Sequence, residues 1–420
     1  MPDFKHASIL EGVRFTAQVA VPNLIQGLLR RRRIATAAAS KTGADGFAVS
    51  FMRGLRRSYG DGPLWIRVGT SEALLLLGRE SIRHALERSP DPFAADPEPK
   101  KSAMSNFQPD ALTISRNPVW EDRRRFTEFV LDAGTRSCAQ RFEAIAAEEA
   151  RSLSEALDWE GWNGAVRRAT RRIVLGEAAA SDEELSLMLA ELMDKSNPPG
   201  RGDGELFSRY SEKLERYVEA GEEGSLVALF DEAPSSAQTR PAGQVTHWLF
   251  ALGDTLAINA LRCLALLATH PDELARVRED PERLPACLHE AMRLWPTTPM
   301  LSREVVRETD WDGVSVPGGT QLLIVNTFNH RDRDQHRFAD RFEPEAWLDG
   351  NATNDWAFNH FSHGPQGCPG VELAMLVGKA MIATLLGERG VRLLEPSIDP
   401  AAPLPYSLDY FSLRFSLPHL

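Results

Sequence analysis

The sequence predicts a mainly α-helical protein with small β-sheets (α+β), folded as a single domain around one long central helix. Segments with helical spacing of apolar residues greatly outnumber strand segments. The longest helix candidate covers residues 244–269, and no linker, repeat or low-complexity block divides the 420 residues. We therefore expect one domain over residues 1–420, in which the segment 1–60 carries the weakest pattern.

The composition and net charge of the chain limit the kinds of partner that we expect it to bind. Hydrophobic residues make up 43% of the chain, which is enough for a large core, and the formal net charge is -11 at pH 7. Nucleic acids and anionic membranes attract positive proteins, so we expect neither as the main partner. The four cysteines lack metal-like or disulfide-like spacing, which fits a reducing, cytoplasmic compartment. We expect Cys263 and Cys287 to be small buried hydrophobes.

The N-terminal segment carries no convincing targeting signal. Residues 13–29 are mildly apolar but are interrupted by Gln18, Pro22 and Asn23, and the basic run 30–33 follows them. A secretory signal has its basic region first, and a membrane span needs a more apolar stretch. We expect no transmembrane segment, and we favour a solvated basic helix end over a peripheral membrane contact.

Elements in the first half of the chain follow from periodicity and turn residues. We expect a strand at 64–68, a helix at about 71–77, a long functional loop at 91–118, and helices from 120 to about 220 with a turn at 196–200.

The second half begins with the long helix at 244–269, which would span roughly 40 Å at the standard rise per residue. Apolar residues surround it, so it should be buried, and Asp254, Asn259 and Arg262 argue against a membrane span. Further along we expect a helix at 285–294, a strand at 322–325, a helix at 369–386 and a strand at 413–417.

Cys368 carries the strongest chemical signal. It follows the glycine-containing segment 361–367 and precedes an apolar helix, with Pro369 at the expected first helical position. Backbone N–H groups of Gly370 and Val371 can donate to its sulfur, and the helix dipole also favours the thiolate. A lone thiolate suits haem, whose iron has its other sites filled, although a structural cysteine at a helix cap explains the residues equally well.

The same segment resembles the haem-binding loop of the cytochrome P-450 family, whose pattern is F-x-x-G-x-x-x-C-x-G. Phe361, Gly364, Cys368 and Gly370 meet its four fixed positions. The resemblance implies that Cys368 is the axial ligand of haem iron. It also implies that haem b lies between the helix after this loop and the long central helix. The family usually has His or Arg two residues before the cysteine to hold a haem propionate, whereas this chain has Gln366.

Glu290 and Arg293 match the E-x-x-R helix of the family, whose role is structural rather than catalytic. At a spacing of three, both side chains lie on one helix face and can pair. The usual third partner is an Arg in the segment before the haem loop. Ala346 occupies its common position, so Arg337 or Arg341 is the candidate substitute.

Ala251, Asp254 and Thr255 match the oxygen-activating motif A-G-x-[DE]-T, with Leu252 in place of its Gly. A buried Asp-Thr pair is costly unless it is satisfied or useful. The Thr255 hydroxyl can bond back to the Ala251 carbonyl and loosen one helical turn. The resemblance implies that Asp254 and Thr255 deliver protons, and the alternative is a polar pair that only bends the helix.

Trp120 and Arg124 match the W-x-x-x-R helix, and their i,i+4 spacing places them on one face. Arg303 resembles the strand Arg that grips a propionate in many bacterial members. With no charge at position 366, we expect Arg124 and Arg303 to hold the propionates. For Arg123 and Arg125, solvated charges and docking of an electron donor are equally favoured.

The resemblance covers about residues 60–417 and looks like the soluble bacterial branch. It implies a monooxygenase acting on a small, hydrophobic organic molecule. NAD(P)H electrons would arrive through a separate ferredoxin or flavodoxin with its reductase, because the sequence shows no flavin or iron–sulfur motif. We expect the 91–118 loop, the turn near Pro198, the long helix and residues 297–301 to line the substrate pocket.

Two alternatives stay open. The first is a peroxygenase that uses hydrogen peroxide, and Thr255 argues against it because peroxide arrives already reduced and protonated. The second is a non-catalytic haem protein for gas sensing or transport. The long 91–118 loop and the buried acid–alcohol pair favour a substrate site instead.

Overall fold

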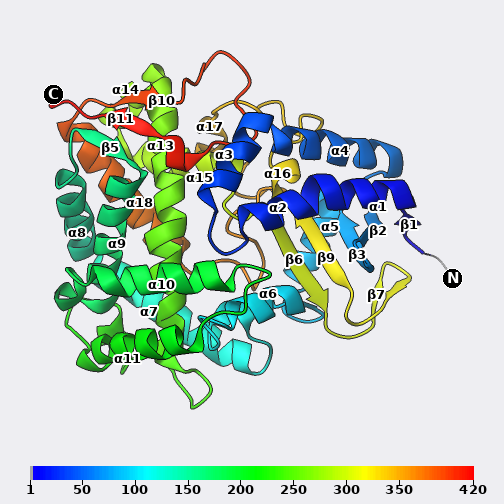
Figure 1. The fold of residues 1–420 in the computed structure, drawn as a ribbon, viewed down its shortest axis with the longest axis horizontal. Coiled ribbons are helices and arrows are strands. Elements are labelled where there is room, and N and C mark those ends of the chain that lie inside the picture. The colour runs from blue at the N-terminus through cyan, green and yellow to red at the C-terminus, as the bar shows by residue number, and fades with distance from the viewer. Residues whose placement is uncertain (1–2) are drawn as a thin grey trace. The chain divides into compact units, whose positions relative to one another are not determined.

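The computed structural model describes residues 3–420, and its many helices and small sheets confirm the mainly α class (Figure 1). The chain divides into two compact units, each assembled from segments far apart in the sequence. Unit 1 contains the chain up to Lys101, Met292–Cys368 and Ala402–Asp409, and unit 2 contains Ser102–Ala291, Pro369–Ala401 and Tyr410–Leu420. The single domain over 1–420 stays a prediction.

Unit 1 is built on a six-stranded sheet of order β1-β2-β3-β9-β6-β4 and a separate β7-β8 hairpin. Its strands are β1 (Lys5–His6), β2 (Pro63–Val68), β3 (Ser71–Leu76), β4 (Phe93–Ala94), β6 (Met300–Val305), β7 (Thr309–Trp311), β8 (Val314–Val316) and β9 (Gln321–Val325). Its helices are α1 (Ile9–Phe15), η1 (Thr16–Ala20), α2 (Val21–Gln26), α3 (Arg33–Thr42), α4 (Ala44–Tyr59), α5 (Arg79–Glu87), α16 (Asn326–Asn329) and α17 (Glu345–Leu348). Helix α6 (Glu98–Met104) crosses into unit 2.

Side chains of this sheet alternate between two buried clusters, as the period of a strand requires. Leu75 and Leu323 pack with Met52 of α4 on one side, whereas Leu74 and Leu322 belong to the cluster that contains α5. The sheet is therefore covered on both faces within unit 1.

The segment 71–77 corrects one expectation, because it forms strand β3 and not a helix. β3 pairs antiparallel with β2, with Val68 opposite Ser71, so Gly69 and Thr70 form a two-residue turn. Gly69 has a φ of +61°, which such a hairpin turn favours. A short apolar run suits either element, and the neighbouring strand decides the outcome.

Unit 2 is mostly helical. Its helices are η2 (Leu112–Ile114), α7 (Val119–Ser137), α8 (Ala139–Arg151), α9 (Trp159–Leu175), η3 (Glu177–Ala179), α10 (Glu183–Ser196), α11 (Gly204–Ala220), η4 (Val227–Leu229), α12 (Pro241–Phe250), η5 (Ala251–Leu256), α13 (Ala257–Thr269), α14 (Pro271–Glu279), η6 (Pro281–Arg283), α18 (Val371–Glu388) and η7 (Tyr410–Ser412). Helix α15 (Leu284–Leu294) crosses into unit 1. The strands β5 (Ala156–Asp158), β10 (Arg392–Glu395) and β11 (Arg414–Ser416) form a sheet of order β10-β11-β5.

These bounds confirm most of the expected elements, including the strands at 64–68, 322–325 and 413–417, the turn after residue 196 and the helix at 285–294. The expected long loop at 91–118 contains a short strand, β4, and a helix, α6. Cys263 and Cys287 are fully buried, and burial raises the pKa of both thiols, so both behave as small hydrophobes.

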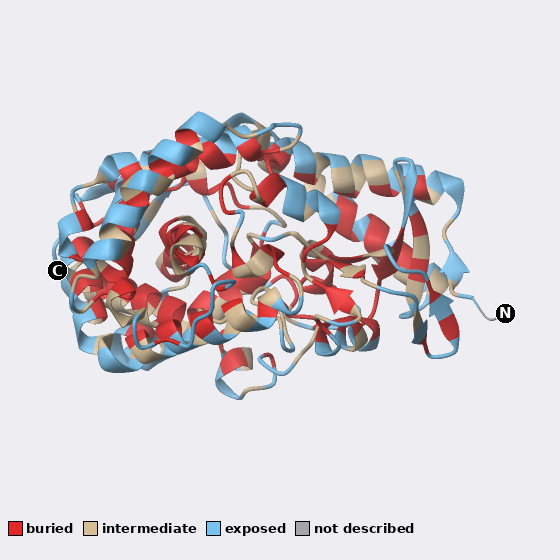
Figure 2. Cartoon of the chain, turned by 90° about the horizontal axis from the view of Figure 1, so that it is seen from below, coloured by how far each residue is buried: buried red, intermediate tan, exposed pale blue. Residues whose placement is uncertain are grey.

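The predicted central helix is present as α12, η5 and α13, which run without interruption over residues 241–269. No residue of this span is exposed, and Figure 2 shows the helix end-on in buried and intermediate colours. By length and composition it could cross a membrane, with a mean hydropathy of 1.5, but 67% of that window is buried inside the protein. Such burial is what a core helix requires.

Candidate functional site

The loop before Cys368 is held by its own backbone in unit 1. The Cys368 N–H donates to the Phe361 carbonyl at 2.8 Å, and the Gly367 N–H donates to the Gly364 carbonyl at 2.9 Å. Gly364 has a φ of +71°, and a Cβ added there would lie 2.1 Å from the Leu86 carbonyl oxygen. Only glycine therefore fits at 364, and the loop presents Cys368 as an exposed residue.

Helix α18 begins two residues later than expected, at Val371, with Gly370 as its N-cap. Pro369 therefore lies in the turn before the helix and is not its first residue. The backbone N–H groups at the start of α18 still follow the cysteine directly. Donation from Gly370 and Val371 to the Cys368 sulfur stays a prediction.

Arg303 of β6 is the buried cation beside this loop. Its side chain donates to the Ser89 hydroxyl at 3.2 Å, the Ser302 carbonyl at 2.9 Å and the Ser362 hydroxyl at 3.0 Å. All three partners are neutral, the residue is only 2% exposed, and burial lowers the pKa of Arg303 to about 10. A buried guanidinium with neutral partners is a strong site for an anion.

Lys100 adds a second cation to the same region of unit 1. Burial and, to a smaller extent, the positive charge of Arg303 lower the pKa of Lys100 to about 7, although the negative charge of Asp96 opposes both effects. Its ammonium donates to the Ala95 carbonyl at 2.9 Å. The sequence alone does not single out Lys100, because one lysine in a polar segment has no distinguishing spacing.

Gln366 lies in the loop between Gly364 and Cys368. Its side-chain oxygen is buried and makes no hydrogen bond within the described residues. A buried amide oxygen without a partner is costly. The position is therefore polar and unsatisfied, as expected if a polar ligand group completes it.

In unit 2, Asp254 lies in the π-helical segment η5 and is held from α9. The Arg167 side chain donates to one Asp254 oxygen from Nη2 at 2.6 Å and from Nε at 3.1 Å. The Asn163 amide donates to the Gly253 carbonyl at 2.8 Å and to the same Asp254 oxygen at 3.3 Å. Sequence reasoning missed Arg167 and Asn163, since both lie about ninety residues before their partner.

Thr255 follows Asp254 in the same widened turn. The expected hydrogen bond from its hydroxyl to the Ala251 carbonyl is not among the contacts of residues 3–420. The turn is instead opened by the π-helical winding of Ala251–Leu256, and the Asn259 amide donates to the Thr255 carbonyl at 3.0 Å. The predicted loosening of the helix is present, with a different cause. Leu252, at the position of the motif glycine, is buried.

Trp120 and Arg124 both lie near the start of α7 in unit 2, and Trp120 is buried. Arg124 forms an i,i+4 ion pair with Glu128, with Nη2 at 2.6 Å from Oε1. An anionic ligand at Arg124 would therefore compete with an existing carboxylate.

The neighbouring arginines differ from each other. Arg123 is buried and bound to Asp110 at 2.7 Å and to the Ser115 hydroxyl at 2.9 Å, so it ties the preceding loop to α7. The side chain of Arg125 is 67% exposed and pairs with Asp122. Both interpretations, a solvated charge and a residue that docks an electron donor, therefore stay open for Arg125 alone.

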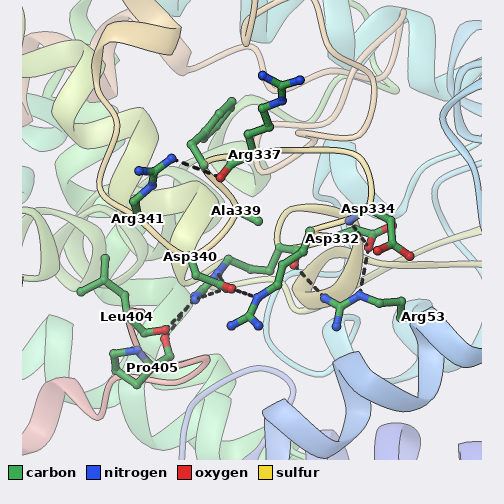
Figure 3. A network of polar contacts seen from close by, with 12 residues as sticks. Arg53, Asp332, Asp334, Arg337, Ala339, Asp340, Arg341, Leu404 and Pro405 are labelled. Carbon is green, nitrogen blue, oxygen red and sulfur yellow. Dashed lines mark hydrogen bonds and ion pairs between the residues drawn. The ribbon is translucent and has the colours of Figure 1, made fainter. Parts of the chain in front are cut away.

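Arg293 of the E-x-x-R pair is fully buried in unit 1. Its guanidinium donates to the backbone carbonyls of His330, Ala339, Phe338 and Arg341. The Arg341 side chain turns to the Arg337 carbonyl instead, at 3.3 Å (Figure 3). Within unit 1 the Arg293 network is thus completed by main-chain carbonyls of 330–341.

The same segment is fixed by further ion pairs. Asp332 accepts from Arg53 (Figure 3). It also accepts from Arg56, and Asp340 accepts from Arg331 and Arg333. Arg331 also donates to the Leu404 carbonyl at 2.7 Å. These contacts hold the stretch that precedes the Cys368 loop.

The predicted residues thus form two groups, each within its own unit. Unit 1 brings Arg303 onto the Cys368 loop through Ser362, and unit 2 brings Asp254 and Thr255 onto one widened helical turn. Trp120, Arg124, Glu290 and Gly370 also belong to unit 2.

Comparisons with known proteins point to one family. The family model described as "Cytochrome P450" matches residues 239–395. The chain is similar to "Cytochrome P450 4c3" of Drosophila melanogaster, at 28% identity over 195 residues, 41% of this chain and 35% of that protein. It is also similar to a methyltetrahydroprotoberberine 14-monooxygenase of Papaver somniferum, at 29% identity over 167 residues, 34% of this chain and 32% of that protein. The matches span about a third of the length of these curated relatives.

A solved structure supports the fold over nearly the whole chain. The cyanobacterial CYP120A1 with bound retinoic acid has a TM-score of 0.72, at 19% identity, and the match covers 88% of this chain and 94% of that one.

Proposed function

Because this chain belongs to the cytochrome P-450 family, we propose that it is a haem-thiolate monooxygenase whose iron is ligated by Cys368. The observation that carries the proposal is the link between Arg303 and the Cys368 loop. Ser362 of that loop accepts a hydrogen bond from Arg303, so one scaffold presents both a thiol and a buried cation.

The residues of unit 1 fit haem. A haem offers an iron that needs one axial ligand and propionates that need cations or polar donors. Cys368 is the exposed ligand candidate, Arg303 is a buried cation with neutral partners, and the Gln366 side-chain oxygen is unsatisfied. Arg303 would hold a propionate most strongly, with support from Lys100, and Gln366 would donate to it only through its side-chain NH2 group. Contact of Trp120 and Arg124 with a propionate stays an expectation from the family resemblance.

Bound haem would supply reductive activation of dioxygen, with one oxygen atom inserted into the substrate and the other released as water. The protein would supply proton control. Arg167 and Asn163 hold the Asp254 carboxylate in a fixed place, and Thr255 next to it has a hydroxyl on the widened turn. We propose that Thr255 holds a proton-carrying water and that Asp254 renews its protons.

The finer parts of the proposal concern the type of haem, the redox partners and the cellular location of the protein. We propose haem b, a small hydrophobic organic substrate, and electrons passed from NAD(P)H through a ferredoxin or flavodoxin with its reductase. A cytoplasmic location is part of the proposal, since a reducing compartment keeps the Cys368 thiol available. We also propose the soluble bacterial type and a role in bacterial secondary metabolism.

Turnover with surrogate redox partners tests the function. The purified holoprotein would be given NADPH, a ferredoxin or flavodoxin system, and a panel of hydrophobic compounds preselected by shifts in the haem spectrum. Oxygenated product that depends on both NADPH and dioxygen supports the monooxygenase. Product formed only with added hydrogen peroxide indicates a peroxygenase. Ligand binding without product in either assay indicates a non-catalytic haem protein.

A further inference from the structure

Among the described residues of unit 2, Gln108 and Gln244 are the buried glutamines, and each is 1% exposed. The Gln244 amide is satisfied at both ends. Its Nε2 donates to the carbonyls of Asp110 and Thr239, at 2.7 and 3.0 Å, and its oxygen accepts from the Leu112 N–H at 2.9 Å. Gln244 therefore needs no further partner.

The Gln108 amide is satisfied at one end only. Its oxygen lies 3.2 Å from Nδ1 of His247 on α12, and His247 donates there because an amide oxygen can only accept. Its Nε2 makes no hydrogen bond with any of residues 3–420. A buried N–H group without an acceptor is destabilising. Gln108 Nε2 thus lacks an acceptor that a bound molecule can supply.

The segment that carries Gln108 is fixed on two sides. Arg123 of α7 donates to the Asp110 carboxylate at 2.7 Å and to the Ser115 hydroxyl at 2.9 Å. Gln244 of α12 holds the main chain of residues 110 and 112. The unpaired Nε2 is therefore held in place by its neighbours, and it lies in the 91–118 stretch that we expect to line the substrate pocket.

The contact with His247 connects Gln108 to one face of the central helix. His247, Ala251 and Thr255 are half-buried, and their spacing of four residues places them on one face, whereas Leu252 is buried. The Ala251 N–H donates to the His247 carbonyl, so these two residues lie on successive turns. One face of a mostly buried helix is thus left partly uncovered by protein. Gln108 contacts the first residue of this face, roughly 12 Å along the axis from Thr255.

The surroundings of Nε2 favour a neutral acceptor on an apolar molecule. Phe107 next to it is buried, and the Phe250 ring lies 5.8 Å from the His247 ring, centre to centre. A buried carboxylate would need a cation. Arg123, which reaches this segment, is already bound to Asp110. The amide itself is uncharged, so a carbonyl oxygen suits it better than a carboxylate.

We propose that the substrate is a mostly apolar molecule with a neutral carbonyl oxygen that accepts a hydrogen bond from Gln108 Nε2. The inference rests on the proposed function and adds a chemical class to its substrate. His247 is the positioning residue, because it holds the other end of the amide. An analogue without the oxygen leaves Nε2 unpaired, so Gln108 determines specificity for that oxygen.

Equilibrium dialysis with matched pairs of ligands tests this inference. The pairs are cyclododecanone and cyclododecane, 2-adamantanone and adamantane, and 2-decalone and decalin, with the holoprotein and no electron donor. Gln108→Met removes the NH2 group at similar length. It should raise the Kd of the bound ketones roughly tenfold, the equivalent of one hydrogen bond, and leave the Kd of the hydrocarbons within about twofold.

Two further variants make the result specific. Gln108→Glu keeps an acceptor for His247 but removes the NH2 group, so it should weaken the ketones as Gln108→Met does. Gln238→Met, the same substitution at an exposed glutamine of unit 2, should leave both ligands of each pair unchanged. The urea midpoint of Gln108→Met without ligand should be no lower than that of the parent, because the unpaired donor is gone.

Three results overturn the inference. They are a parent that binds none of the ketones, a loss in Gln108→Met that is equal for ketone and hydrocarbon, and ketone binding that Gln108→Met leaves unchanged. Because the assay needs neither electrons nor dioxygen, it is independent of turnover. A ketone preference that depends on Gln108, without oxygenated product in the turnover assay, supports this site and contradicts the proposed function.

Discussion

The Arg167 guanidinium grips one oxygen of the Asp254 carboxylate with two nitrogens, at 2.6 and 3.1 Å. Their side chains are only 13% and 15% exposed. The acid of the motif is therefore part of a fixed ion pair between α9 and the widened turn. The pair explains how a charged residue is tolerated in the core helix of unit 2.

This ion pair should be measurable as a coupling energy. Arg167→Gln and Asp254→Asn are each expected to lower the free energy of unfolding by about 1–3 kcal/mol, because each leaves a mostly buried charge without its counter-charge. The double variant should lose less than the sum of the two. Urea unfolding of all four proteins measures the difference, and strict additivity would show that the two residues act separately.

Thr255→Ala should leave haem content unchanged and uncouple electron use from product formation. The hydroxyl is proposed to hold the proton-carrying water, so its loss should reduce oxygenated product per NAD(P)H by roughly tenfold, the equivalent of one hydrogen bond. Product and hydrogen peroxide are measured in one turnover assay, and peroxide should rise as product falls. Thr269→Ala, at the far end of α13, is the matched control. Unchanged coupling in Thr255→Ala would leave the hydroxyl without a catalytic role.

Arg303 should matter more for haem retention than Arg124. Arg303 has only neutral partners, whereas Arg124 is already paired with Glu128. We expect Arg303→Gln to weaken haem binding by about 10- to 100-fold and Arg303→Lys by less, with a smaller loss in Arg124→Ala than in Arg303→Gln. Transfer of haem to apomyoglobin gives the rates.

Arg307→Gln is the control for this series, because that side chain is 61% exposed and pairs with Asp91. Gln366→His should retain haem at least as well as the parent. Equal haem loss in Arg303→Gln and Arg307→Gln would remove Arg303 from the propionate site.

Acid should begin to destabilise the protein at a pH well above the range in which ordinary carboxylates titrate. Burial lowers the pKa of His330 to about 3 and that of His336 to about 4, from an ordinary value of 6.5. Below pH 6.5 both histidines are protonated in the unfolded chain but stay neutral in the folded one. The free energy of unfolding therefore falls as pH falls from 6.5 toward 4. Above pH 6.5 both histidines are neutral in either state and this dependence ends.

Urea midpoints between pH 7.5 and 5 test the effect. His330 accepts from the Asn359 N–H at 3.1 Å through its second nitrogen, so protonation breaks that bond. His330→Gln should flatten the slope of stability against pH, and His419→Gln at an exposed position should leave it as in the parent. An unaltered slope in His330→Gln would assign the acid sensitivity to other groups.

Local patterns predicted the parts of this protein that depend on local sequence. The spacing around Cys368 predicted a glycine-dependent loop, and Gly364 indeed has no room for a Cβ beside Leu86. Apolar residues on all faces predicted a buried helix at 244–269, and the structure has it over 241–269. The Asp-Thr pair predicted its disturbed turn, although π-helical winding opens it and not the Thr255 hydroxyl.

Long-range partners were not predictable from spacing. Ser89 contacts Arg303 across 214 residues, and Arg167 contacts Asp254 across 87. Arg293 is satisfied by main-chain carbonyls, which have no sequence signature. The segment 71–77 was wrongly predicted as a helix, because pairing with the adjacent strand β2 is what makes it a strand.

The central claim is that Cys368 ligates haem iron as a thiolate, and the absorbance of the reduced, carbon monoxide-bound protein tests it most directly. The parent should absorb near the wavelength diagnostic of thiolate ligation. Cys368→Ser should lose that band, and Cys138→Ser, at the half-buried cysteine of unit 2, should keep it. A thiolate band that persists in Cys368→Ser, or is missing from the parent loaded with haem, would contradict the assignment.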